Sequence, residues 1–173
     1  MSLKNIIGKE RTQAKDRAGF HTRFQLINDT TIEETDEFGH TRQFHLNKEK
    51  GTWEAEGIYP QKAELTIVGK NLFSVKESYQ GSYETILYSP NRKVQEMFVQ
   101  GKSGKYFLAE RTDEDLNGTR DRQLFDENNQ LIEQRILEKG ALKKLVRGDQ
   151  VLIDSTKSAS LKLKNVAKTS NVR

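Results

Sequence analysis

An acidic segment in the second half of the chain has the spacing of a calcium-binding loop. The oxygen-bearing side chains at its positions 1, 3, 5 and 9 are Asp113, Asp115, Asn117 and Asp121. Gly118 stands at position 6, where such loops turn sharply, and a hard cation needs several converging oxygens of this kind. Leu124 occupies position 12, where an EF-hand places a bidentate glutamate. The segment therefore predicts either a structural calcium site or an acidic hairpin turn built on Asn117 and Gly118.

Three arginines in later segments could hold the carboxylate of a ligand. Arg111, Arg122 and Arg135 alternate with acidic residues such as Glu110 and Glu133. A guanidinium that points into a β-barrel can bind a carboxylate through two parallel hydrogen bonds. Cross-strand ion pairs explain the same charges without any ligand. The sequence leaves both interpretations of these arginines open.

The remaining reactive side chains form weaker patterns. His21 and His45 could face each other across two strands, with His40 in a turn, but solvent-facing histidines are the simpler interpretation. Glu54 and Glu56 share one face of a predicted strand, and paired carboxylates can do acid–base chemistry as well as keep a surface polar. The chain has no Cys, which excludes thiol nucleophiles, disulfides and cysteine-bound metals. Because it also lacks the common hydrolase, nucleotide-binding and zinc-protease motifs, the sequence favours a non-enzymatic protein.

Short strands would position these side chains, because apolar and polar residues alternate along most of the chain. The segments with the clearest alternation are 20–26, 43–46, 63–68, 73–79 and 94–99. This period of two is typical of half-buried strands, and turn residues separate the segments at intervals of roughly 8–12 residues. We therefore predict an all-β, antiparallel up-and-down meander of about ten strands that closes into a calycin-like barrel, with a β-sandwich as the alternative.

Two stretches carry a family resemblance. Gly51-Thr52-Trp53 resembles the Gly-x-Trp signature of lipocalins and related calycins, in which the tryptophan packs across the closed end of the barrel. Residues 119–138 are similar to a hairpin in lipocalin-like domains of uncharacterised cyanobacterial proteins. The resemblance implies a barrel that could hold a hydrophobic ligand, and it transfers no catalytic residue. Without it, Trp53 is expected to be a core aromatic residue.

Bulky side chains at alternating positions are the candidate lining of such a barrel. They are Phe24, Phe44, Trp53, Leu65, Phe73, Tyr83, Phe98, Tyr106 and Leu108. We predict that they bind a small hydrophobic or amphipathic ligand, although they could equally fill a core without a ligand. The alternative function is a protein–protein interaction module, and a weaker third one is an isomerase-like or chromophore-handling enzyme. An apolar cavity would favour the carrier, whereas a filled core with an exposed apolar patch would favour the interaction module.

Two basic ends flank a mildly acidic body. Residues 1–17 carry a net charge of +3 and residues 157–173 carry +5, whereas the remainder carries −4. The basic C-terminal stretch contains no aromatic residue that could stack on a base, so we expect no nucleic-acid partner. We predict an N-terminal helix or arm at 1–18, a barrel domain at 19–156 and a basic tail at 157–173, which could dock on an acidic partner.

The first residues also give an indication of the protein's subcellular location. Leu3, Ile6 and Ile7 could share one face of a short helix, while Lys4 and Lys9 are not followed by the apolar region of a signal peptide. The longest apolar runs span only a few residues, far short of the ~18–20 that a membrane-spanning helix needs. We therefore expect a cytoplasmic protein with no membrane span.

Overall fold

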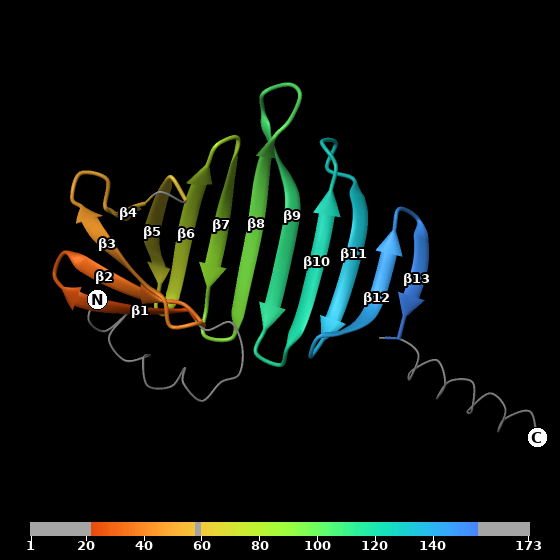
Figure 1. Cartoon of the computed structure of the whole chain (residues 1–173), viewed down its shortest axis with the longest axis horizontal. Helices are drawn as coiled ribbons and strands as arrows, with labels where there is room; N and C mark the ends of the chain where they lie inside the picture. Colours follow the sequence, from red (N-terminus) through yellow and green to blue (C-terminus); the bar gives the residue numbers. More distant parts are fainter. Residues whose placement is uncertain (1–21, 58–59, 156–173) are drawn as a thin grey trace, which may run out of the picture.

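The protein is a single antiparallel β-sheet in its computed structural model, which describes residues 22–57 and 60–155. The sheet has thirteen strands, and their spatial order is their order in the chain (Figure 1). The strands are β1 (Arg23–Asn28), β2 (Thr31–Thr35), β3 (Thr41–Asn47), β4 (Thr52–Glu56), β5 (Lys62–Gly69), β6 (Leu72–Tyr79), β7 (Ser82–Tyr88), β8 (Arg92–Gln100), β9 (Tyr106–Asp115), β10 (Thr119–Phe125), β11 (Leu131–Glu138), β12 (Ala141–Arg147) and β13 (Gln150–Asp154). The prediction of an all-β up-and-down meander is thus confirmed.

The finer parts of that prediction need correction. The sheet has thirteen strands rather than about ten, because the period-two pattern also continues through short, highly charged segments. β1 and β13 stand at the two ends of the strand order, and no pairing between them closes a barrel within residues 22–57 and 60–155. These residues also contain no helix, and so none that could cross a membrane. The helix predicted at 1–18 and the tail at 157–173 lie outside the described residues.

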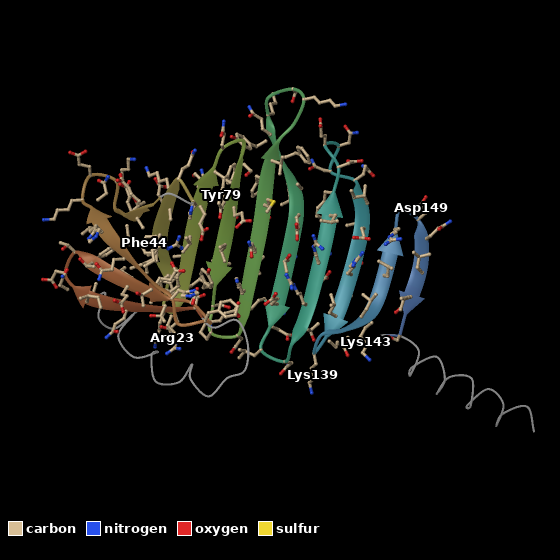
Figure 2. All side chains as sticks on the ribbon, in the orientation of Figure 1. Arg23, Phe44, Tyr79, Lys139, Lys143 and Asp149 are labelled. Carbon is tan, nitrogen blue, oxygen red and sulfur yellow. The ribbon has the colours of Figure 1, made fainter. Side chains whose placement is uncertain are left out.

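The first seven strands carry a hydrophobic core on one face of the sheet, which we call the inner face. Figure 1 shows β1 and β2 lying across the direction of the later strands. The ring of Phe24 in β1 lies 4.7 Å from that of Phe73 in β6 and 5.4 Å from that of Tyr88 in β7. The core residues are Phe24, Ile32, Phe44, Trp53, Ala55, Ala63, Leu65, Phe73, Val75, Ile86 and Tyr88. Rolling the first strands over the sheet therefore buries the apolar side of β1–β7 (Phe44 is labelled in Figure 2).

The same face becomes polar when it is followed beyond β7. Starting from Leu65, the directly opposed residues on successive strands are Val75, Ile86, Gln95, Thr112, Arg122, Arg135, Leu145 and Ile153. In β8–β13 only Thr112 and Leu145 are buried. This half of the sheet is a single layer, and Figure 1 shows no described element covering it. Its order rests on backbone pairing and cross-strand side-chain contacts rather than on a core.

One turn design recurs three times and fixes the register of its hairpins. Asp36 Oδ1 accepts hydrogen bonds from the backbone N–H groups of Phe38 (2.9 Å) and His40 (2.8 Å). Asp115 and Asp126 accept the same two hydrogen bonds, from the backbone N–H groups of the residues two and four positions further along the chain. In each turn the fourth residue has a positive φ, which explains a glycine or asparagine there: Gly39, Gly118 and Asn129.

Candidate functional site

A polar cleft opens where the β2–β3 hairpin overhangs strands β6–β8. Its volume is about 410 Å³. The lining residues that the structure describes are Thr22, Glu34, Asp36, Glu37, Phe38, His40, Thr41, Arg42, Glu77, Glu84, Ile86, Tyr88, Lys93 and Gln95. Carboxylates outnumber basic side chains in this lining, so the cleft favours a positively charged group over an anion.

Arg42 links two carboxylates inside this cleft. Its Nε and Nη2 donate to Glu34 Oε2 at 3.0 and 2.7 Å, and Nη2 also donates to Glu77 Oε1 at 3.1 Å. The guanidinium lies over the ring of Phe44, with 4.9 Å between Cζ and the ring centroid. The hydroxyl of Tyr79 donates to Glu77 Oε2 at 2.8 Å. These bonds hold the overhanging hairpin to β6 and fix the shape of the cleft.

Burial controls the charge of the groups in the cleft. Burial raises the pKa of Glu34, and the nearby Arg42 guanidinium offsets only part of this effect. Burial also raises the pKa of Tyr88, so its hydroxyl stays protonated. Arg42 itself loses solvation, but the adjacent carboxylates of Glu34 and Glu77 outweigh this loss and raise its pKa. The cleft thus holds a fixed cation among carboxylates, which is suited to orienting a polar ligand.

A second groove runs along β3 and β4, with a volume of about 700 Å³. It contains Glu54 and Glu56, the carboxylates that the sequence placed on one strand face. Glu54 accepts a hydrogen bond from Asn47 Nδ2 at 3.3 Å and lies 3.6 Å from the ammonium groups of both Lys50 and Lys62. These contacts make Glu54 part of a surface ion-pair network.

The predicted ligand-lining aromatic residues do not line one cavity. Phe24, Phe44, Trp53 and Phe73 are packed in the core, each with 5% or less of its surface exposed. Tyr83, by contrast, belongs to the opposite, outer face of the sheet. Its ring stacks on that of Phe98 at 4.8 Å and lies 5.2 Å from that of Tyr106, while Lys76 Nζ lies 4.5 Å from its centroid. Leu65 joins the core, and Leu108 pairs with Phe98.

The three predicted carboxylate-binding arginines are divided between the two faces. Arg122 and Arg135 are opposite each other on β10 and β11, on the inner face. Arg111 precedes Thr112, the partner of Arg122, and so projects to the outer face, where its Nη2 lies 3.7 Å from Asp113. Only Arg122 and Arg135 can therefore act on the same ligand.

The predicted calcium ligands serve the β9–β10 hairpin. Asp115 accepts the two turn hydrogen bonds described above. Asp113 and Asp121 are cross-strand partners, held by Arg92 (3.3 Å) and by Gln134 Nε2 (3.1 Å) respectively. Asn117 occupies the turn itself. The geometry accounts for these residues without a cation, and calcium binding stays a prediction.

The histidines are not brought together either. His40 Nδ1 lies 3.2 Å from Asp36 Oδ2, and His45 Nδ1 lies 3.4 Å from Thr31 Oγ1. His21 lies outside the described residues. Within residues 22–57 and 60–155, no group of three His, Cys, Asp or Glu side chains could hold a metal ion.

A group of exposed apolar side chains on the last three strands was missed by the sequence analysis. We call it the C-terminal apolar patch, and its residues are Leu131 (38% exposed), Ile132 (48%), Leu142 (37%), Val151 (59%), Leu152 (49%) and Ile153 (40%). The signal in the sequence is the run Val151-Leu152-Ile153, three apolar residues in an otherwise polar stretch. Because all three are exposed in β13, the patch reaches the end of the sheet.

The chain was also compared with proteins of known family and structure. No family model, no curated protein and no solved structure matches it. The lipocalin resemblance therefore has no independent support, and the function has to be argued from the geometry.

Proposed function

We propose that the protein is a non-enzymatic protein–protein interaction module that binds its partner through the C-terminal apolar patch. The observation that carries this proposal is the exposure of Val151, Leu152 and Ile153 on the last strand of the sheet. Val151 is paired with Val146 and Ile153 with Leu145, so the exposed apolar side chains of β13 are divided between the two faces of the sheet. Exposed apolar side chains gathered at one edge of a folded protein commonly mark interaction sites. The part of this function assigned from the sequence to the basic tail, 157–173, lies outside the described residues.

The filled core supports this function over a carrier of hydrophobic ligands. Phe44, Leu65 and Val75 are fully buried, and the rings of Phe24, Phe73 and Tyr88 are in direct contact. The aromatic residues expected to surround a ligand therefore pack on one another. A carrier would instead leave an apolar cavity of a few hundred cubic ångströms between them.

The position of β13 suggests how a partner would bind. β13 pairs with β12, and it has no second neighbouring strand among those that the structure describes. Such an edge offers main-chain donors and acceptors to an added strand, while side-chain contacts supply specificity. We propose that a partner segment adds to this edge and covers the patch.

Site-specific photo-crosslinking tests this function. A photoreactive residue would replace Leu152 in the full chain, expressed in the cells that naturally contain the protein. The matched control replaces Val68, which is 56% exposed in β5, away from the patch. We expect a defined adduct from position 152 and none from position 68. Equal labelling, or no adduct from position 152, would contradict the proposal.

The polar cleft favours a second candidate function, the binding of a small amphipathic ligand. Its volume of about 410 Å³ is within the usual size of a ligand site. Ile86 and Tyr88 supply apolar surface, and the surrounding carboxylates favour a ligand with a positively charged group. Calorimetric titration with a short-chain alkylamine tests it: Glu77→Gln should weaken binding about tenfold, and Glu96→Gln should leave it unchanged. Equal affinities would exclude this site.

A further inference from the structure

We infer that Arg122 and Arg135 form a binding site for a carboxylate group on the inner face of the single-layer half of the sheet. The two residues are directly opposed on β10 and β11. Like charges in this position destabilise an antiparallel pair. An anion that binds both guanidinium groups would remove that cost. This inference goes beyond the proposed interaction function and does not depend on it.

Most of the hydrogen-bond donors of this arginine pair remain available. Arg122 Nε donates to Glu110 Oε1 at 2.7 Å, and Arg135 Nη2 donates to Glu133 Oε1 at 3.3 Å. The Nε of Arg135 is buried and has no hydrogen-bond partner among the described residues. A guanidinium has five N–H donors, and leaving a buried donor unpaired is costly. If the Arg135 side chain turned its Nε toward solvent, a bound carboxylate could accept from Nε and Nη together.

Four ion pairs lie around the site, and they contain one more basic than acidic side chain. Four arginines and three glutamates form them: Arg120–Glu114, Arg122–Glu110, Arg135–Glu133 and Arg147–Glu133. Glu133 is thus shared by two guanidinium groups. A carboxylate has both the charge and the planar shape that match a guanidinium.

Each arginine of the pair has a buried neighbour on one side and is partly exposed to solvent. Leu145 is opposite Arg135 and Thr112 is opposite Arg122, and both of these neighbours are buried. The side chains of Arg122 and Arg135 are 39% and 38% exposed, so they can reach a ligand from solution and turn toward it. Their buried neighbours remove part of the surrounding water, which strengthens an ionic contact relative to one made fully in solvent.

Side-chain NMR of the full chain tests the inference directly. Nε–Hε resonances of the arginines would be followed while sodium acetate replaces sodium chloride at constant ionic strength. We expect saturable shifts of the Arg122 and Arg135 signals, with a dissociation constant of about 1 mM. The signal of Arg111, on the outer face, should not move. Absence of saturable shifts at Arg122 and Arg135 would overturn the inference.

Two variants and a second anion sharpen the test. Arg122→Gln should weaken the response of the Arg135 signal to acetate at least tenfold, whereas Arg111→Gln should leave it unchanged. Equal effects of the two substitutions would mean general screening and would overturn the site. Circular dichroism of each variant checks that the sheet is retained. A response to inorganic phosphate with none to acetate would overturn the assignment to a carboxylate.

Discussion

Glu84 lies on the inner face of the sheet, where the hydrophobic core gives way to charged residues. Burial raises the pKa of its carboxyl group; the hydrogen bond from Gln95 Nε2 (2.8 Å) opposes this effect, and the negative charges of Glu77 and Glu110 add to it. The folded protein therefore holds this proton more tightly than the unfolded chain. The stability that this proton contributes is fully present when the pH is below 4.5, the ordinary pKa of a glutamate. It is lost as the pH rises through the higher pKa of the folded state.

Glu84→Gln should consequently unfold at a higher urea concentration than the wild type at neutral pH, and the two proteins should converge in acid. Glu64 serves as a control with a pKa shift in the opposite direction, because its hydrogen bond and ion pair with Lys62 lower its pKa. Glu64→Gln should lose stability at neutral pH and match the wild type in acid. Urea titrations followed by Trp53 fluorescence measure both. A destabilised Glu84→Gln protein at neutral pH would contradict this account of the inner face.

Asp115 separates the two interpretations of the acidic loop. Its Oδ1 accepts from the backbone N–H groups of Asn117 and Thr119, and an asparagine can supply the same oxygen. We expect Asp115→Ala to cost about 1 kcal/mol of stability and Asp115→Asn to cost much less. Thermal unfolding with calcium and with a chelator should give the same midpoint. A midpoint raised by calcium in the wild type and not in Asp115→Asn would show a cation site.

At the scale of elements, strand positions could be predicted from the sequence because alternation and turn residues are local properties. Which face each side chain occupies could not, because it depends on register. The predicted carboxylate-binding arginines show this, because Arg111 and Arg122 project to opposite faces of the sheet. The predicted ligand-lining aromatic residues show it too, since Phe73 and Tyr83 also lie on opposite faces. A register irregularity between Met97 and Phe98 further separates the pattern of β8 and β9 from that of the earlier strands.

The two halves of the sheet should differ in their response to truncated aromatic residues. Phe44 is fully buried in the core, so Phe44→Ala should cost about 3–5 kcal/mol. Phe98 is half-buried and stacks on Tyr83 on the outer face, so Phe98→Ala should cost clearly less than Phe44→Ala. Urea unfolding of the two variants provides the comparison. Similar costs would mean that a second core covers β8 and β9.

For the whole molecule, an unequal distribution of apolar contacts predicts unequal local stability. Buried side chains lie mainly in β1–β7, and β13 has none. Hydrogen exchange should therefore be slowest in β4–β6 and fastest in β12 and β13. Uniform protection along the sheet would contradict a core confined to one half. The location in the cytoplasm and the lack of a nucleic-acid partner stay predictions from the sequence.

Neither the roll of β1–β3 nor the free position of β13 could be predicted from alternation. The same hydrophobic pattern suits a closed barrel and a partly rolled sheet, since both bury one face of the early strands. What distinguishes them is the inner face of the later strands, where Gln95, Arg122 and Arg135 stand in place of core residues. Enclosing these polar and charged side chains in a dry barrel interior would cost desolvation energy, which disfavours closure.

The separation between the first and last strands tests the open sheet most directly. Because the chain has no Cys, spin labels can be placed at Ile27→Cys and Val151→Cys, two exposed positions in β1 and β13. Val146→Cys with Val151→Cys, on paired strands, gives the short-distance reference. Phe24 of β1 contacts β6 and β7, and β7 lies six strand spacings from β13, so the account predicts a separation of at least roughly 30 Å between the labelled backbones. A value matching the reference pair would mean a closed barrel, and would contradict both the open sheet and the interaction edge proposed on it.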